Sequence, residues 1–386
     1  MQHKPCCRHK TLMGMDRRLT TAVLTGSRSD YGIYLPLLKA LREDKSFDLR
    51  LLVFGTHLSE RYGMTVRQIE EDGFNIFFRS ETLSEGDSPG DITLSMARTM
   101  SGFTPLWDST HFDLIFALGD RYEMFAAVAS ALPFNIPVAH IHGGETTRGA
   151  IDNAFRHAIT SMAKYHFTSA DSYRNRVIEI IGSGSHVFNV GALSIGNLRT
   201  LELLSIDGMK GKYGIDFSLP AILITFHPET VGFQKNKEYI DEIIKALEKL
   251  DSYQQVITMP NADTMGLLIR NRLKEYCRGR DRVFCIESFG TPDYLSAIKY
   301  CSLMLGNSSS GFVEASYFAK PVINLGERQT GRIITPNIQN IPVTSEAILR
   351  AVNGIKQTEN IKDCQIYGEG DTAREIIRVI KKSYSI

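Results

Sequence analysis

Two apolar segments of the sequence, residues 114–118 and 138–141, are each followed at once by ionisable side chains. These side chains are Asp120, His142, Glu145 and, one short loop later, Asp152. Apolar runs of this length are typical of buried parallel strands, and such sheets bind ligands just beyond the carboxyl ends of their strands. We therefore expect the acids and the histidine to meet in one cleft and to carry out acid–base chemistry. The alternative, that Asp120 is only a helix cap, explains one residue and not the group.

A loop of small residues, 25–32, follows the first predicted strand and precedes a leucine-rich helical segment. Its backbone N–H groups and the guanidinium of Arg28 could bind an anion. The loop has neither the GxGxxG fingerprint of dinucleotide-binding proteins nor the GxxxxGK[ST] sequence of P-loop enzymes, which weakens the dehydrogenase and ATPase interpretations. In the alternative interpretation, Ser29 or Asp30 caps the helix and Arg28 is solvated.

A second loop of this kind, residues 306–311, precedes a helical segment that contains Glu314. Small residues at a helix N-terminus let backbone amides and hydroxyls surround a phosphate, whose charge the helix dipole favours. The residues that we assign to a diphosphate site are Ser308, Ser309, Ser310 and Gly311. Glu314 is placed to accept hydrogen bonds from ribose hydroxyls, or else it only complements the helix dipole as a first-turn acid.

His227 follows the apolar run 221–226 and is expected to face the same cleft. Either as a cation or as a hydrogen-bond donor, its imidazole could stabilise a departing phosphate. Asn261 and Asp263 end the next predicted strand and should shape the pocket. The sequence has no Cys-x-x-Cys, His-Glu-x-x-His or G-x-S-x-G pattern, so zinc hydrolysis and serine hydrolase chemistry have no candidate residues. We expect no metal site.

Strand-like apolar runs alternate with helical segments, and the pattern restarts near residue 221. Such alternation predicts parallel sheets that are covered by helices on both faces. We therefore expect an α/β protein with two Rossmann-like, doubly wound domains and a ligand site in the interdomain cleft. The predicted segments are a leader at 1–18, domains at 19–194 and 195–370, and a closing helix at 371–386 that could pack on either domain.

Composition narrows the classes of partner. Lys and Arg number 44 against 43 Asp and Glu, so nothing indicates nucleic acid or a membrane surface as a partner. No apolar stretch is long enough for a membrane span, and no signal peptide is recognisable, which predicts a cytoplasmic protein. The six scattered cysteines are typical of reduced thiols. We interpret the leader, with its His3, Cys6, Cys7 and His9, as disordered or non-native rather than as a metal site.

Several motifs, taken together, resemble the hydrolysing UDP-N-acetylglucosamine 2-epimerase family. They are TGSRSDYG, LGDRYE, HIHGGE, AIDNAFRHAIT, FHPET, PNADT and GNSSSGFVEA, which occur in the family's order. The resemblance is greatest to the bacterial sialic-acid-pathway branch, and it implies the two-domain fold of B-type glycosyltransferases. Non-hydrolysing relatives usually begin with a GTRPE-like loop, whereas here Arg28 is followed by Ser29-Asp30-Tyr31-Gly32, which favours the hydrolysing branch.

The resemblance also implies roles for the residues that match the family motifs. Asp120 and Asp152 then match the family's catalytic acids, and His227 matches its motif histidine. Arg28 matches the first-loop arginine, Ser308–Ser310 match the diphosphate loop, and Glu314 matches the ribose-binding acid. One departure matters. Where many members have a glutamate, as in HIEGGE, this chain has His142, with Glu145 three residues later. The acid–base role of that glutamate is open: it could pass to His142, to Glu145, or be shared by both.

The implied reaction is loss of UDP from C1 with removal of the C2 proton, followed by addition of water to the resulting glycal with the opposite configuration at C2. The products would be N-acetylmannosamine and UDP. Arg28, His227 and the serine loop would stabilise the leaving UDP. No hydride moves, so no cofactor is expected, and the family analogy implies a homodimer or homotetramer.

Other functions remain open on the sequence alone. The same chemistry could act on a UDP-2,4-diacetamido-2,4,6-trideoxyhexose of the legionaminic-acid type, or the protein could be a non-hydrolysing UDP-GlcNAc 2-epimerase. A glycosyltransferase of the same fold would use the nucleotide loops, but the acids of the first domain would then be unexplained. A non-catalytic nucleotide-sugar-binding protein would bind UDP without turnover.

Overall fold

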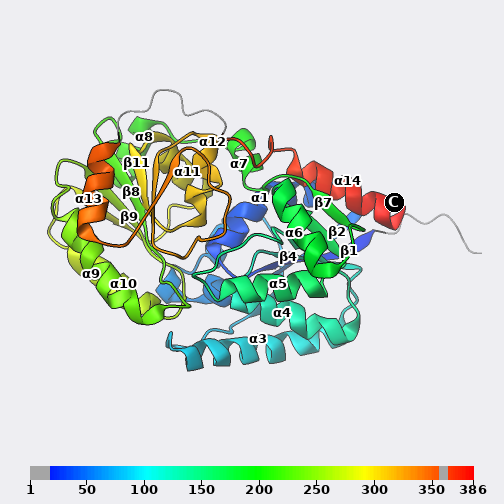
Figure 1. Ribbon diagram of the computed structural model, residues 1–386. Coiled ribbons are helices and arrows are strands. Elements are labelled where there is room, and N and C mark those ends of the chain that lie inside the picture. The colour runs from blue at the N-terminus through cyan, green and yellow to red at the C-terminus, as the bar shows by residue number, and fades with distance from the viewer. Residues whose placement is uncertain (1–17, 356–363) are drawn as a thin grey trace, which may run out of the picture.

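The computed structural model describes residues 18–355 and 364–386, and the first half of the chain is built on a seven-stranded sheet (Figure 1). The strands lie in the order β3-β2-β1-β4-β5-β6-β7 and pair in parallel. Their bounds are β1 Leu19–Thr25, β2 Phe47–Phe54, β3 Ile76–Ser80, β4 Leu114–Leu118, β5 Val138–Ile141, β6 Tyr165–Thr168 and β7 Val187–Asn189. The predicted leader, apart from Arg18, lies outside the described residues.

The second half repeats this arrangement with a six-stranded parallel sheet in the order β10-β9-β8-β11-β12-β13. The bounds are β8 Ala221–Thr225, β9 Gln254–Thr258, β10 Val283–Ile286, β11 Leu303–Gly306, β12 Val322–Leu325 and β13 Ile338–Ile341. In both sheets the chain begins in the middle, builds to one edge and then returns to build to the other, which is the doubly wound pattern. The predicted fold class is confirmed.

Strand β13 is the one strand of the described residues that the apolar pattern does not predict. It lies at the edge of the second sheet, beside β12. Its two central residues, Gln339 and Asn340, are exposed and polar. A short edge strand buries little apolar surface, so its sequence carries no run of apolar residues to detect.

Helices cover both faces of the first sheet. Helices α1 and α14 pack on one face, and α3 and α4 pack on the other (Figure 1). The bounds are α1 Arg28–Glu43, α2 Val66–Glu71, α3 Pro89–Ser109, α4 Tyr122–Ala131, α5 Asp152–Met162, α6 Asp171–Ile181 and α14 Thr372–Tyr384. Helix α14 therefore brings the end of the chain back to the first half, where Ile376 and Ile380 are fully buried and Lys381 Nζ lies 2.9 Å from Asp44 Oδ2.

The second sheet is covered in the same way, with α9, α10 and α13 on one face and α8 and α11 on the other. The bounds are α7 Ile195–Thr200, α8 Ile206–Tyr213, α9 Asn236–Leu247, α10 Gly266–Cys277, α11 Thr291–Tyr300, α12 Glu314–Tyr317 and α13 Ser345–Gly354. Residue 195, near which the sequence predicts the domain division, is the first residue of α7, between the last strand of the first sheet and the first strand of the second. The domain bounds stay a prediction.

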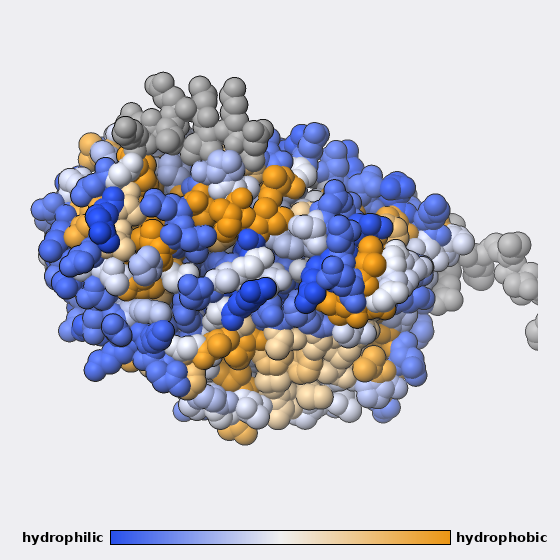
Figure 2. Space-filling model, viewed as in Figure 1, coloured by the Kyte–Doolittle hydropathy of each residue, from blue (hydrophilic) through white to orange (hydrophobic). Residues whose placement is uncertain are grey.

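The surface is largely polar, but an apolar area lies over α3, α4 and α5 (Figure 2). Two large apolar side chains of α3, Leu94 and Met100, are 53% and 40% exposed. Within the described residues, no helix is both long enough and apolar enough to cross a membrane. The expected homodimer or homotetramer stays a prediction.

Candidate active site

The strand order of each sheet reverses at one point, between β1 and β4 in the first and between β8 and β11 in the second. The loops after these strands line a single cavity of about 910 Å³ between the two halves. The predicted site residues in its lining are Arg28, Asp120, His142, Glu145, Asp152, His227, Ser308, Ser309, Ser310 and Glu314. Doubly wound sheets bind ligands at these reversal points. Tertiary structure therefore brings the predicted residues of both halves together.

Gly311 is the predicted site residue that does not line the cavity. A Cβ atom at this position would lie 3.0 Å from Cγ1 of Val322 on β12, which is tighter than an ordinary contact. The missing side chain of Gly311 is thus explained by close packing against the sheet. Its assignment to the diphosphate site has no support from its position.

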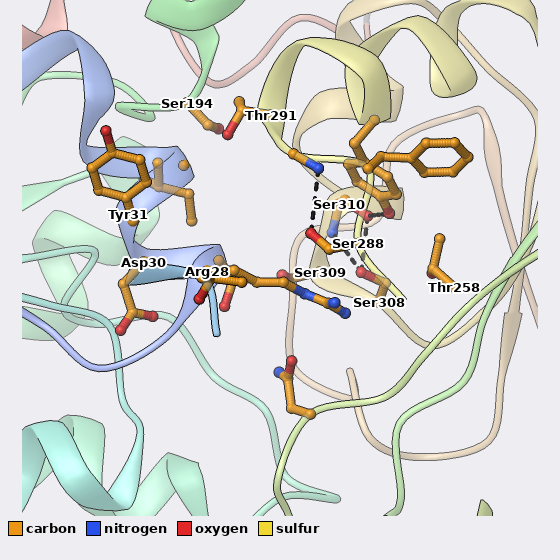
Figure 3. A pocket seen from close by; sticks show the side chains of 18 of the residues that line it. Arg28, Asp30, Tyr31, Ser194, Thr258, Ser288, Thr291, Ser308, Ser309 and Ser310 are labelled. Carbon is orange, nitrogen blue, oxygen red and sulfur yellow. Dashed lines mark hydrogen bonds between the residues drawn. The ribbon is translucent and has the colours of Figure 1, made fainter. Parts of the chain in front are cut away.

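Arg28 begins α1 and reaches across the cavity toward the serine loop of the second half (Figure 3). Its Nη2 donates to the main-chain oxygen of Met259 at 2.8 Å, and its Nη1 donates to the main-chain oxygen of Glu287. The N-cap of α1 is Ser27, which exchanges reciprocal bonds with Asp30. The alternative in which Ser29 or Asp30 caps the helix and Arg28 is solvated is therefore wrong.

The serine loop keeps its hydroxyl groups together inside the cavity (Figure 3). Ser310 Oγ lies 2.8 Å from Ser308 Oγ and 2.6 Å from Tyr294 Oη. The helix that follows is shorter than predicted, because a 3₁₀ turn at Ser309–Gly311 comes first and α12 has only four residues. So short a helix aligns few peptide dipoles. This loop could therefore bind an anion through its hydroxyl and main-chain N–H groups, rather than through a helix macrodipole.

His227 follows β8, and hydrogen bonds fix its orientation. Its Nδ1 accepts from the main-chain N–H of Asn261 at 3.2 Å, and its own main-chain N–H donates to Asn307 Oδ1 at 2.7 Å. Because Nδ1 accepts, the neutral ring carries its proton on Nε2. Burial, reinforced by the charge of Arg328, lowers the pKa of His227 to about 3. Of the two predicted forms, the geometry supports the neutral hydrogen-bond donor and not the cation.

Glu145 is a fully paired, buried carboxylate. Its Oε2 accepts from Arg332 at 2.7 Å and from Arg156 at 2.8 Å, and its Oε1 accepts from Ser169 Oγ at 2.8 Å. Burial alone would raise the pKa of Glu145, but the charges of Arg332 and Arg156 outweigh burial and hold the pKa well below its ordinary value. A carboxylate paired in this way is a poor carrier of protons, so the geometry favours an anchoring role.

His142 lies directly after β5 with a left-handed backbone, at φ 63°. Its Nε2 accepts from the main-chain N–H of Leu193 at 3.2 Å, and its Nδ1 lies 3.5 Å from Glu145 Oε1. Burial lowers the pKa of His142 although the charge of Glu145 opposes it, so the ring is neutral with its proton on Nδ1. Both nitrogens are engaged within the protein, which leaves neither to receive a proton from a ligand.

Asp120 and Asp152 are then the predicted acids best placed for proton transfer. Asp152 begins α5 and lines the cavity without a side-chain hydrogen bond to any described residue. Burial, together with the charges of Asp120 and Asp263, raises the pKa of Asp152 to about 7. Asp120 is 20% exposed in its side chain and accepts from Arg156 Nη2. Near neutral pH, Asp152 can therefore exist in either protonation state.

An ion pair that the sequence patterns do not reveal joins the two halves. Arg121 Nη1, from the first half, donates to Asp263 Oδ1 of the second half at 3.1 Å. Arg328 Nη2 donates to the other oxygen of the same carboxylate at 3.1 Å. Burial would raise the pKa of Asp263, but the two arginines outweigh it and lower the pKa. Asp263, expected only to shape the pocket, thus joins the two halves.

Arg156 and Arg332, which hold Glu145, are the other residues that sequence analysis missed. Arg156 is four positions after Asp152, a spacing that places both side chains on one face of α5, so the sequence did contain a signal for it. Arg332 lies in the loop after β12, where no periodicity relates it to the site. Only the packing of the two halves brings it to Glu145.

Fold and site together define a class: a two-domain α/β protein whose interdomain cavity places a serine-rich loop opposite buried acids. A family model described as UDP-N-acetylglucosamine 2-epimerase matches residues 39–381. The chain belongs to this family.

Its relatives include proteins named for hydrolysing epimerisation. The chain is 37% identical to the polysialic acid biosynthesis protein P7 of Escherichia coli over 87% of this chain and 85% of that protein. It is 33% identical to the UDP-N,N'-diacetylbacillosamine 2-epimerase (hydrolyzing) of Legionella pneumophila over 93% and 94%. A UDP-GlcNAc 2-epimerase structure from Neisseria meningitidis, bound to UDP-GlcNAc, matches with a TM-score of 0.79 at 17% identity, over 94% of this chain and 100% of that one. That structural match supports the fold alone.

Proposed function

We propose that the protein converts UDP-N-acetylglucosamine and water to N-acetylmannosamine and UDP, in the cytoplasm and as a step of sialic acid biosynthesis. The observation that carries the proposal is Asp152, a buried acid with a pKa of about 7 in the same cavity as a serine loop suited to a diphosphate. Groups whose pKa lies near the working pH are efficient general bases. The similarity to a polysialic acid biosynthesis protein supports the choice of pathway.

The first step of the proposed reaction is an elimination. The ionised Asp152 accepts the C2 proton while the bond between C1 and the diphosphate oxygen breaks, which yields UDP and a 2-acetamidoglucal. The C2 hydrogen is not next to a carbonyl, so it becomes acidic mainly as positive charge grows at C1. Departure of UDP must therefore be strongly stabilised. Arg28, the Nε2–H of His227 and the Ser308–Ser310 loop are the groups that supply this stabilisation.

The second step is a hydration. Water adds its hydroxyl to C1 of the glucal and its proton to C2 on the opposite face, which gives N-acetylmannosamine. Asp120, held beside Arg156, orients this water, and Asp152 returns its proton to solvent. In this scheme Glu145 and His142 exchange no proton. Glu145 holds Arg156 and Arg332, and His142 holds the main chain at Leu193.

Proton NMR of the purified protein with UDP-N-acetylglucosamine in D₂O tests the proposal. Free UDP and N-acetylmannosamine with deuterium at C2 are the expected products. UDP-N-acetylmannosamine would instead indicate the non-hydrolysing reaction. An intact substrate would contradict the proposal for this sugar, and binding of UDP without turnover of any UDP-sugar would indicate a transferase or a binding protein.

A second candidate is the same reaction on a UDP-2,4-diacetamido-2,4,6-trideoxyhexose. The 33% identity to a relative named for a diacetamido sugar favours it over a glycosyltransferase or a non-catalytic binding protein. The two substrates differ at C4 and C6 and share the chemistry at C1 and C2. The ratio of kcat/KM for the two substrates, measured by UDP release, decides between them. A larger kcat/KM for the diacetamido sugar would replace the first proposal.

The pH dependence of turnover tests the role of Asp152. We expect kcat/KM to rise with pH through an apparent pKa of about 7, because Asp152 must be ionised to accept the proton. If Asp152 had the pKa of an aspartate in water, kcat/KM would rise at about pH 3.9 instead. UDP release measured from about pH 5 to about pH 9 covers the transition. A flat profile over this range would contradict the assignment.

Glu314 should contribute mainly to binding. It lines the cavity beside the serine loop, where its carboxylate can accept from ribose hydroxyls. Replacing Glu314 by Gln should raise the Kd of UDP about 10-fold or more, since hydrogen bonds to a charged acceptor contribute about 1.5–3 kcal/mol. Titration calorimetry with UDP measures the effect. Glu346→Gln, an exposed change on α13, is the control, and an equal Kd in both variants would contradict the assignment.

A further inference from the structure

A chain of buried hydrogen bonds starts beside the serine loop of the second half. Gln329 Nε2 donates to the main-chain oxygen of Asn307, directly before Ser308, at 2.7 Å. Arg332 Nε donates to Gln329 Oε1 at 2.6 Å. Arg332 Nη1 then crosses to the first half and donates to Glu145 Oε2 at 2.7 Å. The chain therefore links the candidate diphosphate loop to a carboxylate of the other half.

The chain continues in the first half as far as Asp120. Arg156 Nη1 donates to Glu145 Oε2 at 2.8 Å, and Arg156 Nη2 donates to Asp120 Oδ2. The side chains of Arg332, Glu145 and Arg156 are only 4%, 3% and 3% exposed. Positive and negative charges alternate along the chain and compensate one another. Loss of one member would leave a buried charge without its partner.

Arg332 is suited to this place because it bonds on two sides at once. Its Nε is directed to Gln329 and its Nη1 to Glu145, and the guanidinium plane holds these donors in a fixed relation. A lysine at this position could reach one partner but could not hold both in that geometry. Both contacts are to the protein, so Arg332 needs no contact with substrate to act.

We propose that Arg332 is a positioning residue that sets Asp120 relative to the diphosphate loop. The proposal rests on the proposed function, since Asp120 must meet the sugar while the loop holds the diphosphate. The two groups belong to different halves of the molecule, and Arg332 is the link of the chain that crosses between them. A misplacement of about 1 Å between reacting groups can cost about 10²-fold in rate.

The first experiment compares Arg332→Met, Arg332→Lys and the matched surface control Arg350→Met on α13. Arg332→Met should lower kcat about 10²-fold while the Kd of UDP stays within about threefold, because positioning and not binding is lost. Arg332→Lys should recover part of the lost kcat, and the control should match wild type. Parallel loss of UDP binding and kcat, or an unchanged kcat, would overturn the proposal.

A double variant separates positioning from a general structural role. If Arg332 acts through Asp120, adding Arg332→Met to Asp120→Asn should lower kcat by less than about twofold further. Two independent effects would multiply, and multiplication would overturn the proposal. Should Arg332→Met fail to fold, Gln329→Met breaks the same chain one link earlier and replaces it in the cycle.

Hydrogen exchange in the absence of ligand keeps this test separate from the proposed reaction. Amides of residues 119–122, around Asp120, should exchange faster in Arg332→Met than in Arg350→Met, since their anchor through Arg156 is weakened. Wild-type protein that turns over neither UDP-sugar would refute the proposed function alone. Equal exchange of this segment in the two variants would refute the positioning role, whatever the reaction.

Discussion

Replacing Asp152 by asparagine should lower kcat at least about 10²-fold while leaving the Kd of UDP within about threefold. The amide has the shape of the carboxylic acid but cannot accept the C2 proton. Burial and the charge of Asp120 raise the pKa of Asp152 to about 7, which is the property that the proposed elimination step uses. The candidate diphosphate loop is in the other half of the molecule, so UDP binding should survive. UDP release and titration calorimetry measure the two quantities.

Asp120→Asn should show the same pattern, with turnover lost and UDP binding retained. Asp281→Asn, an exposed change before β10, serves as the control and should behave like wild type. A difference between the two site variants would be informative. If Asp152→Asn retained near-normal turnover while Asp120→Asn did not, the base would be Asp120 and the role given to Asp152 would be wrong.

Replacing Glu145 by glutamine should destabilise the protein by about 3–5 kcal/mol at neutral pH, because two buried arginines lose the charge that compensates them. Arg156 and Arg332 donate to this carboxylate from the two halves of the molecule, and Ser169 donates to its other oxygen. Urea unfolding at pH 7, compared with wild type, measures the loss. Glu346→Gln on the surface should change the unfolding free energy by less than about 0.5 kcal/mol.

The pH dependence of this difference follows from the sign of the shift. The charges of Arg332 and Arg156 outweigh burial and hold the pKa of Glu145 in the folded protein well below its ordinary value. The stability that Glu145 contributes is therefore present above the unfolded pKa of about 4.3 and is lost as the pH falls toward the folded pKa. Wild type and Glu145→Gln should thus converge in stability in acid. A constant difference down to about pH 3 would show that the charge of Glu145 is not what stabilises the fold.

Much of the architecture follows from local patterns in the sequence. The strand at 114–118 is a continuous apolar run, so its burial on both faces could be predicted from the sequence alone. The helix that begins at Arg28 has its own N-cap in the residue before it, Ser27. The family motifs lie in the loops after these strands, which is why the candidate acids, Arg28 and the serine loop could be named. Edge strand β13 escaped prediction because burial of its side chains is slight.

Tertiary structure decides the hydrogen-bond partners and the protonation of the site residues. His142 and Glu145 have residue types suited to acid–base chemistry, but partners far along the chain engage them: Leu193 bonds the imidazole and Arg332 the carboxylate. Asp152 has the same type as the surface aspartates, yet burial beside Asp120 moves its pKa to about 7. A sequence determines which groups are available and which strands carry them. Burial and charge pairing across two packed halves, which depend on contacts distant in sequence, decide which of those groups can exchange a proton.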